Sequence, residues 1–466
     1  MRFSSAPVYK KEFSGQGVFV FADSANPRPQ VFQGKQEEVY AYDTAAGRTF
    51  LVGLGKKADF SADKTRLAAY HLIKAAAKAK LTRVAAELPP VFDLAAFLDG
   101  CYLANYRFAG RHKKTKEKTP EQIEKVYLLG QYPSLKTLIR RREIIFAAVD
   151  QTKDLVNLPG NIVTPAYLEM VAKKIAAKSK VKLSTFNLAQ AKQAGLTAFG
   201  AVAQGADTPA KFIVLQYLNG GPKPKIALVG KGVTFDSGGL SLKPAANMGE
   251  MKTDMAGAAA VLAAFGVLVD LRVKQNILCI VPATENLPSG RAYKPGDIIT
   301  SADGLTVEIN STDAEGRLIL CDALWYAQKL GAQKIIDYAT LTGACQIALG
   351  ETRAGVMTNS QNFLNDYLAA AEKTGEKHWQ LPMDAEYLEL LNSKTADTLN
   401  NSSERLAGTI SAAKFLERFI QKGVDWIHCD IAGTAFLKKQ QRYLEPQATG
   451  FGVRTLVELL GQEGGR

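Results

Sequence analysis

Short apolar runs and longer amphipathic stretches alternate along the first third of the chain. The apolar runs predict strands at 18–21, 39–42 and 49–54. The Ala- and Lys-rich stretch 64–80 has the spacing of a helix, and 135–156 predicts one long amphipathic helix. A Leu-Pro-Gly-Asn cluster at 158–161 ends that helix. The pattern therefore predicts a small α/β domain followed by a connecting helix.

The remainder of the chain continues the alternation with more strongly apolar runs. Runs typical of buried strands lie at 212–217, 226–230, 277–281, 335–339 and 426–431. Helical stretches such as 255–270 and 411–421 lie between them. This spacing predicts a larger α/β domain with a mostly parallel central sheet covered by helices. In such sheets, binding sites form beyond the carboxyl ends of the strands.

The length of the chain agrees with two domains. Its 466 residues exceed the ~250–300 at which one hydrophobic core stops growing. We predict a smaller N-terminal α/β domain over 1–133, a linker helix over 134–158 and a larger catalytic domain over 159–466.

The composition is that of a globular protein, with 47% hydrophobic and 22% charged residues. No apolar run approaches the ~20 residues of a membrane helix, and the first residues lack the apolar stretch of a secretory signal, so we expect a cytoplasmic protein. The five cysteines are scattered without a CxxC pair. This argues against a disulfide framework and against a cysteine zinc site.

Positive charge is concentrated near the N-terminus. Residues 1–150 hold 25 Lys and Arg against 15 Asp and Glu, which accounts for +10 of the net charge of +13. The densest basic runs, 111–118 and 140–142, are compatible with nucleic-acid binding. A solvated surface or a subunit contact is the favoured explanation, because no nucleic-acid motif accompanies them.

Ionisable residues crowd into two glycine-rich segments of the larger domain. The first, 228–254, carries Lys231 directly after a predicted strand, Asp236 before Ser-Gly-Gly, then Lys243, and Asp254 at the start of a small-residue helix. The second, 307–320, places Asp313, Glu315 and Arg317 at alternate positions. If this second segment is extended, its three side chains point the same way.

Four carboxylates that converge on one pocket repel one another unless cations neutralise them. Two divalent metal ions would do so, and such a pair can share bridging carboxylates and activate a water molecule as nucleophile. A lysine amine can also ligate a metal when burial and neighbouring cations keep it neutral. Taken singly, each residue has a simpler explanation, such as a turn, a helix cap or a surface ion pair. The combination favours a metal site.

Several segments resemble those of the leucyl aminopeptidase family of dimetal exopeptidases, in the same order, over about 150–455. STDAEGRL at 311–318 resembles the family signature NTDAEGRL, and VGKGVTFDSGGLSLKP at 229–244 resembles its lysine-bearing metal loop. The segments MKTDMAGAAAV, PSGRAYKPGDI, ATLTGA and DIAGTAF are also similar. Over 1–130 the resemblance is weak. Ser311 replaces the leading Asn of the signature, and Phe436 stands where family members usually have Trp.

The resemblance implies roles for individual residues. Five match metal ligands for two divalent ions, manganese or zinc: Lys231, Asp236, Asp254, Asp313 and Glu315. Lys243 would stabilise the oxyanion, and Arg317 would hold a bicarbonate ion that shuttles a proton. An apolar pocket for the substrate side chain would include Met251, Thr340, Gly343, Ala432 and Ala435.

These inferences predict a metal-dependent aminopeptidase that releases leucine and other apolar residues from peptide N-termini. The resemblance also implies a homohexamer. Two alternatives remain: a nucleic-acid-binding protein that uses the basic N-terminal third, with or without catalysis, and a different dimetal hydrolase such as a phosphatase. Metal identity and side-chain preference are not determined by ligand types.

Overall fold

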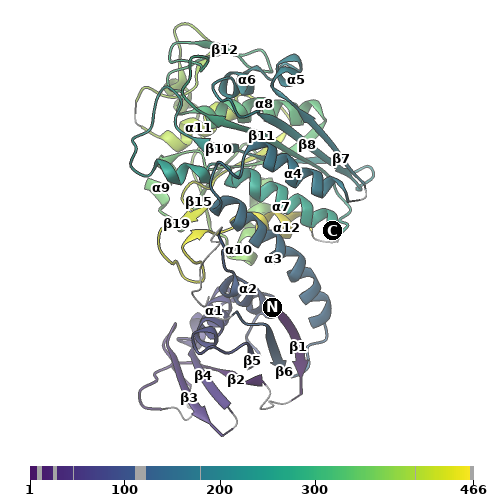
Figure 1. Cartoon of the computed structure of the whole chain (residues 1–466), viewed down its shortest axis with the longest axis vertical. Helices are drawn as coiled ribbons and strands as arrows, with labels where there is room; N and C mark the ends of the chain where they lie inside the picture. Colours follow the sequence, from purple (N-terminus) through teal and green to yellow (C-terminus); the bar gives the residue numbers. More distant parts are fainter. Residues whose placement is uncertain are drawn as a thin grey trace. The chain divides into compact units, whose positions relative to one another are not determined.

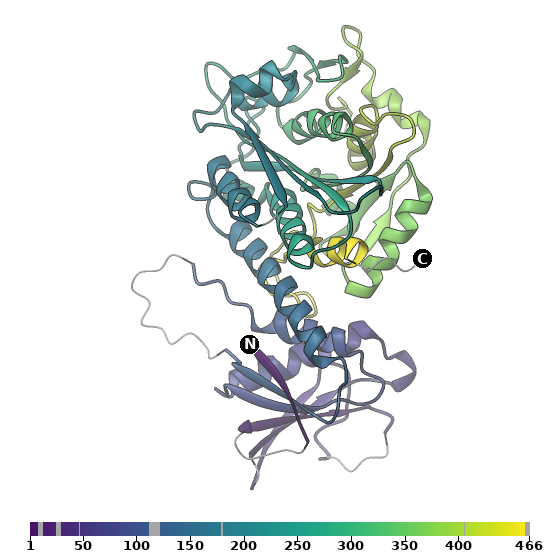
Figure 2. The same cartoon turned by 90° about the vertical axis from the view of Figure 1, so that its right-hand side faces the viewer.

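A computed structural model describes residues 1–7, 13–24, 29–45, 47–110, 122–178, 180–404 and 406–461. The chain divides into two compact units (Figures 1 and 2). The first comprises Met1–Ala147 and Lys439–Pro446, and the second comprises Ala148–Lys438 and Gln447–Arg466. The predicted basic run 111–118 lies outside the described residues.

The first unit is built on a six-stranded sheet in the order β1-β6-β5-β2-β4-β3. All its pairings are parallel except that of β3 with β4. The strands are β1 Arg2–Ala6, β2 Gly15–Val20, β3 Val39–Thr44, β4 Gly47–Gly53, β5 Arg83–Glu87 and β6 Lys125–Leu129. The predicted strands at 18–21, 39–42 and 49–54 are thus present as β2, β3 and β4, and β2 begins three residues earlier than expected.

Two helices of this unit, α1 Ala62–Lys78 and α2 Leu94–Asn105, pack against each other. Ser61 caps α1 by accepting a hydrogen bond from the Lys64 N–H at 3.3 Å, which satisfies one of the free donors at a helix start. The helix predicted over 64–80 is therefore confirmed. The long helix predicted over 135–156 is present as α3 Leu135–Asn157, and the division between the units falls within it.

The second unit contains a nine-stranded sheet in the order β16-β15-β18-β14-β9-β11-β8-β7, with β10 also paired to β11. Its central strands β18, β14, β9 and β11 are parallel, whereas β8 and β7, and the pairing of β15 with β18, are antiparallel. The bounds are β7 Val181–Phe186, β8 Lys211–Leu218, β9 Lys225–Gly230, β10 Gly232–Asp236, β11 Asn276–Asn286, β14 Ala332–Ala339, β15 Ala354–Thr358, β16 His378–Gln380 and β18 Asp425–Asp430. This confirms the predicted α/β class.

Helices cover both faces of this sheet (Figure 2). On one face α7 Ala256–Asp270 packs with α4 Pro165–Ala176 and α12 Val453–Leu460; on the other, α8 Glu315–Lys329 packs with α6 Thr197–Ala203 and α11 Gly408–Glu417. All eleven residues of β11 are buried, as expected for a strand covered from both sides. The remaining elements include α5 Leu188–Gln193, α9 Gly343–Leu349, α10 Gln361–Thr374, β12 Ile298–Thr300, β13 Thr306–Glu308, β17 Thr398–Leu399, β19 Phe436–Leu437 and β20 Gln447–Ala448.

Contrary to the expectation from apolar runs, one helical stretch among the described residues, Met248–Asp270, is long and apolar enough to cross a membrane. Its most apolar window is 94% buried within the protein, which is the behaviour of a core helix. Every residue from Ala256 to Val269 is buried. Its apolar character is therefore explained by its position between the sheet and neighbouring helices.

Candidate metal centre

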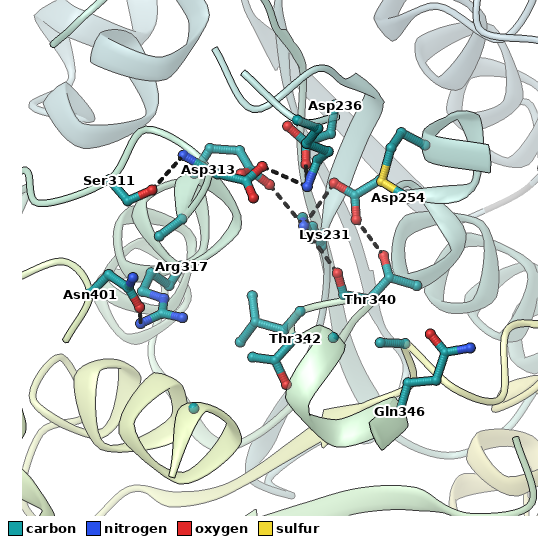
Figure 3. A pocket seen from close by; sticks show the side chains of 18 of the residues that line it. Lys231, Asp236, Asp254, Ser311, Asp313, Arg317, Thr340, Thr342, Gln346 and Asn401 are labelled. Atoms are coloured by element: carbon teal, nitrogen blue, oxygen red, sulfur yellow. Dashed lines mark hydrogen bonds and ion pairs between the residues drawn. The ribbon is translucent and has the colours of Figure 1, made fainter. Parts of the chain in front are cut away.

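A cavity of about 370 Å³ lies beyond the carboxyl ends of the parallel strands of the second unit (Figure 3). Lys231 directly follows β9, and Asp236 is the last residue of β10. Asp254 follows a short 3-10 helix, Met248–Thr253, immediately before α7. The fold therefore delivers side chains from separate segments to the sheet edge where α/β proteins bind ligands.

The segment that carries Asp313, Glu315 and Arg317 is not extended, so the conditional expectation of a shared strand face is wrong. Asp313 lies in a turn, and Glu315 is the first residue of α8. The positive end of the helix dipole favours a carboxylate at this position. A tight turn followed by a helix, rather than strand alternation, brings Asp313 and Glu315 to the same cavity.

Two lysine ammonium groups bridge the four carboxylates (Figure 3). The Lys231 Nζ lies 2.8 Å from Asp254 and 2.9 Å from Glu315. The Lys243 Nζ lies 2.9 Å from Asp236 and 2.6 Å from Asp313. The five predicted ligands and Lys243 are therefore brought together in one cluster.

The electrostatics of this cluster are unbalanced, because four carboxylates face two ammonium groups. Burial raises the pKa of Asp254 and of Asp236, although their lysine partners oppose the shift. Burial, together with the charge of Asp236, raises the pKa of Asp313 to about 6. Burial alone would lower the pKa of Lys231, but Asp254 and Glu315 raise it above its ordinary value. The buried site thus favours additional positive charge.

Divalent cations fit this donor set. One oxygen from each of Asp236, Asp313 and Glu315 lies within 4.8 Å of the other two, close enough for them to share an ion. Carboxylate oxygens suit hard and borderline divalent ions. The Lys231 amine would join them as a neutral ligand, since adjacent cations depress the pKa of an ammonium group.

Two glycines make this crowding possible. A Cβ on Gly316 would lie 2.6 Å from Lys231 Cε, so only glycine admits the lysine beside the start of α8. Gly238 has a φ of +88°, and a Cβ there would lie 2.9 Å from the Asp313 carboxylate. Glycine adopts this left-handed conformation without steric cost. These contacts explain the glycines beside both charged motifs.

Asn286, which the sequence did not single out, forms hydrogen bonds with the carboxylate cluster. Its Nδ2 donates to Asp236 Oδ1 at 2.9 Å and to the Thr312 carbonyl oxygen at 3.0 Å, and lies 3.5 Å from Glu315 Oε2. It is the last residue of β11. The signal in the sequence was the polar Thr-Glu-Asn stretch that ends the apolar strand β11.

Arg317 is separated from the carboxylate cluster within the same cavity (Figure 3). Its side chain is only 5% exposed, and its Nη1 donates to the Asn400 carbonyl oxygen at 2.9 Å and to Asn401 Oδ1 at 3.4 Å. Its Nε is buried without a hydrogen-bond partner among the described residues. Burial lowers the pKa of Arg317 to about 10. A guanidinium with a free donor beside a cavity suits a small anion.

Four of the five predicted substrate-pocket residues line this cavity: Met251, Thr340, Gly343 and Ala432. The fifth, Ala435, is buried and is not among the lining residues. Thr340 also donates from Oγ1 to Asp254 at 2.7 Å, so it orients that carboxylate. Further lining residues that the sequence reading missed are Thr253, Ala314, Leu341, Thr342, Gln346, Asn401 and Gly408.

The described basic residues of the N-terminal region gain no functional role from the structure. In the run 140–142, Arg142 forms an ion pair at 2.7 Å with Asp99, whose side chain is buried. A guanidinium that already pairs with an internal carboxylate is not available to bind a polyanion. Among the described residues, no observation favours nucleic-acid binding.

An α/β sheet with a carboxylate cluster of this kind at its edge is typical of metal-dependent enzymes. A model of the cytosol aminopeptidase family catalytic domain matches residues 150–457, and a model of its N-terminal domain matches 30–115. The chain belongs to the cytosol aminopeptidase family. It is therefore a metal-dependent aminopeptidase, a hydrolase of peptide bonds.

Relatives match over most of the chain. It is 42% identical to a probable cytosol aminopeptidase of Geobacter sp. (strain M21), over 89% of this chain and 86% of the relative. A probable cytosol aminopeptidase of Aquifex aeolicus is 38% identical over 97% and 96% of the two chains.

Solved structures show the same architecture. The bottromycin maturation enzyme BotP in complex with Mn aligns with a TM-score of 0.87 at 32% identity, covering 96% of this chain and 99% of that one. A mutant of tomato leucine aminopeptidase aligns with the same TM-score and identity over 98% and 95%.

Proposed function

We propose that the aminopeptidase uses two divalent ions, manganese or zinc, held by Lys231, Asp236, Asp254, Asp313 and Glu315. The observation that carries this proposal is the meeting of four carboxylates and two lysines in one buried cluster. Bound there, the ions would neutralise the carboxylates, polarise the scissile carbonyl group and lower the pKa of water to make a nucleophile.

Lys243 supplies a positive charge that is not needed as a ligand. Its side chain is 22% exposed to the cavity, whereas that of Lys231 is 4% exposed. Once cations occupy the carboxylates, its ammonium group is released to donate to the oxyanion that develops on the substrate carbonyl. Removing one such donor commonly lowers turnover by about 10²–10³-fold.

Arg317 is suited to hold a bicarbonate ion that takes up a proton during attack. The free Nε and the planar, delocalised charge of the guanidinium fit a planar, singly charged oxyanion. Asn400 and Asn401 accept hydrogen bonds from Nη1, so the guanidinium is oriented before the anion arrives. Proton transfer through a positioned group contributes about 10²–10⁴-fold.

The substrate side chain would enter the part of the cavity lined by Met251, Thr340, Gly343 and Ala432. A methionine and small residues leave room for a leucine-sized side chain, which supports a preference for apolar N-terminal residues. Gln346 adds an amide to this part of the cavity.

The test is turnover of aminoacyl amides after exhaustive chelation and after re-addition of manganese, zinc, cobalt or magnesium. We expect no activity in the chelated protein, recovery with a divalent ion and two ions per chain by metal analysis. N-acetylated amides should remain uncleaved. Full activity in metal-free protein would overturn the proposal.

By family resemblance we also propose a homohexamer in the cytoplasm. Its relatives carry the name cytosol aminopeptidase. Sedimentation equilibrium should give six times the chain mass of 50.4 kDa. A monomer at micromolar concentration would contradict the hexamer without affecting the metal site.

A further inference from the structure

Asp430 is a buried carboxylate outside the metal cluster that ties two loops together. It is the last residue of β18, is 0% exposed and does not line the cavity. Its Oδ1 accepts hydrogen bonds from the Leu341 and Ala432 N–H groups, both at 3.1 Å. Its Oδ2 accepts from Thr342 Oγ1 at 2.6 Å. One side chain therefore binds the loop after β14 and the loop after β18.

These two loops form one wall of the cavity. Leu341, Thr342 and Gly343 line it from the first loop, and Ala432 lines it from the second. Thr342 extends the connection, because its Oγ1 also accepts from the Cys345 N–H at 3.1 Å and lies 2.9 Å from Thr409 Oγ1 on α11. The start of α9 is thereby fixed to the same carboxylate.

A buried charge is costly unless its acceptors are satisfied. Burial raises the pKa of Asp430, and the donors from Thr342, Ala432 and Leu341 oppose that shift, together with the charge of His428. A neutral apolar residue would avoid this cost but would leave the backbone donors of both loops without an acceptor. The buried Asp430 carboxylate therefore carries a desolvation cost, but it fixes the geometry of both loops.

We propose that Asp430 is a positioning residue that sets the side-chain preference of the enzyme by holding both loops of the substrate wall. This inference rests on the proposed placement of the substrate side chain against Gly343 and Ala432. Displacing a binding wall by about 1 Å can cost about 100-fold in rate. Because Asp430 does not line the cavity, it would act through the two loops rather than by direct contact with the substrate.

The decisive variants are Asp430→Ala and Asp430→Asn, assayed with manganese on leucyl, alanyl and phenylalanyl amides. We expect D430A to raise KM for the leucyl amide and to reduce the ratio of kcat/KM between leucyl and alanyl amides by about tenfold. D430N should restore the ratio. The amide oxygen of the substituted side chain can still accept from the Leu341 and Ala432 N–H groups. Its amide nitrogen can donate to Thr342 Oγ1, which then donates to Thr409.

Asp322 provides a matched control. It is also 0% exposed, and it joins two segments by accepting from the Phe199 and Ala302 N–H groups, both at 2.9 Å. It does not line the cavity. D322A should lower the thermal midpoint and leave the leucyl-to-alanyl ratio unchanged. An unchanged ratio in D430A, or an equal change in D322A, would overturn the proposal.

A second pair of variants tests the role of Asp430 if D430A does not fold. Thr342→Val removes one bond to Asp430 and should shift the ratio by about threefold. Thr409→Val keeps that bond and should not shift it. Equal ratios in both variants and the wild type would refute the role of Asp430. A wild type inactive with every metal would instead refute the proposed function, so the two failures are distinguishable.

Discussion

The two units of this protein both carry parallel strands and bury carboxylates, but they balance the buried charge differently. In the N-terminal unit, Asp99 is 3% exposed and faces two guanidinium groups, Arg142 at 2.7 Å and Arg66 at 3.7 Å. In the larger unit, four carboxylates share two lysines. The first arrangement has enough positive charge from its own residues, and the second does not.

This difference separates a structural ion pair from a binding site. A buried charge that pairs with an opposite charge of the same protein is part of the folded structure, and removing one partner leaves the other charge buried without compensation. Buried charges that are unmatched favour an external ion, and perturbed pKa values accompany them. The balance of charge, rather than burial or the presence of carboxylates, distinguishes the two regions.

The largest effect should follow from Glu315→Gln, which removes one carboxylate from the cluster. Because Glu315 contacts Lys231 and lies within 4.8 Å of Asp236 and Asp313, we expect loss of at least one bound metal ion and a fall in kcat/KM of about 10³-fold or more. Metal analysis measures the number of bound ions, and turnover of aminoacyl amides measures kcat/KM. Glu308→Gln, on β13 and outside the cavity, is the control and should retain two ions. A fully loaded and active E315Q would remove Glu315 from the site.

Lys243→Ala should come next, because it removes the ammonium group assigned to the oxyanion. We expect kcat to fall by about 10²–10³-fold with metal content unchanged. Lys225→Ala, which removes a lysine bonded to the Leu330 carbonyl oxygen, serves as the control. If K243A loses metal rather than turnover, Lys243 belongs with the ligands.

Asp99→Ala tests the balanced region. It removes the buried carboxylate that both Arg66 and Arg142 face, while Arg66 keeps its ion pair with Asp63, so the free energy of unfolding should fall by about 3 kcal/mol. Metal content and kcat per folded molecule should not change. Asp43→Ala breaks the exposed pair with Arg48 and should cost below about 1 kcal/mol in chemical denaturation. Equal losses in the two variants would contradict the comparison.

The smallest effect should come from Asn286→Ala, which removes a hydrogen bond to Asp236 but no ligand. Such partners typically contribute about 10–100-fold in metal affinity. Asn276, at the other end of β11, donates to the Gly221 and Lys223 carbonyl oxygens and offers a control on the same strand. Competition with a chelator should show weaker metal binding in N286A alone. Identical affinities would limit Asn286 to a structural role.

The sequence predicted most elements because their periodicity is local. The apolar runs at 277–281 and 335–339 are buried strands, and the small apolar residues of 255–270 form the core helix α7. Element ends were less accurate, as in β2, because pairing with β4 rather than local pattern decides where a strand begins. The segment after Ser311 was misjudged as a possible strand because alternating charge resembles strand periodicity.

The sequence by itself determined which chemical groups are present, their close spacing within each motif and the family to which they belong. Only the tertiary structure decided that Lys231 and Glu315 meet at 2.9 Å, that Asn286 supports them and that Ala435 does not line the cavity. It also revealed Asp430 behind the substrate wall. Motif spacing is a local property of the chain, whereas charge balance depends on segments that only the folded sheet brings together.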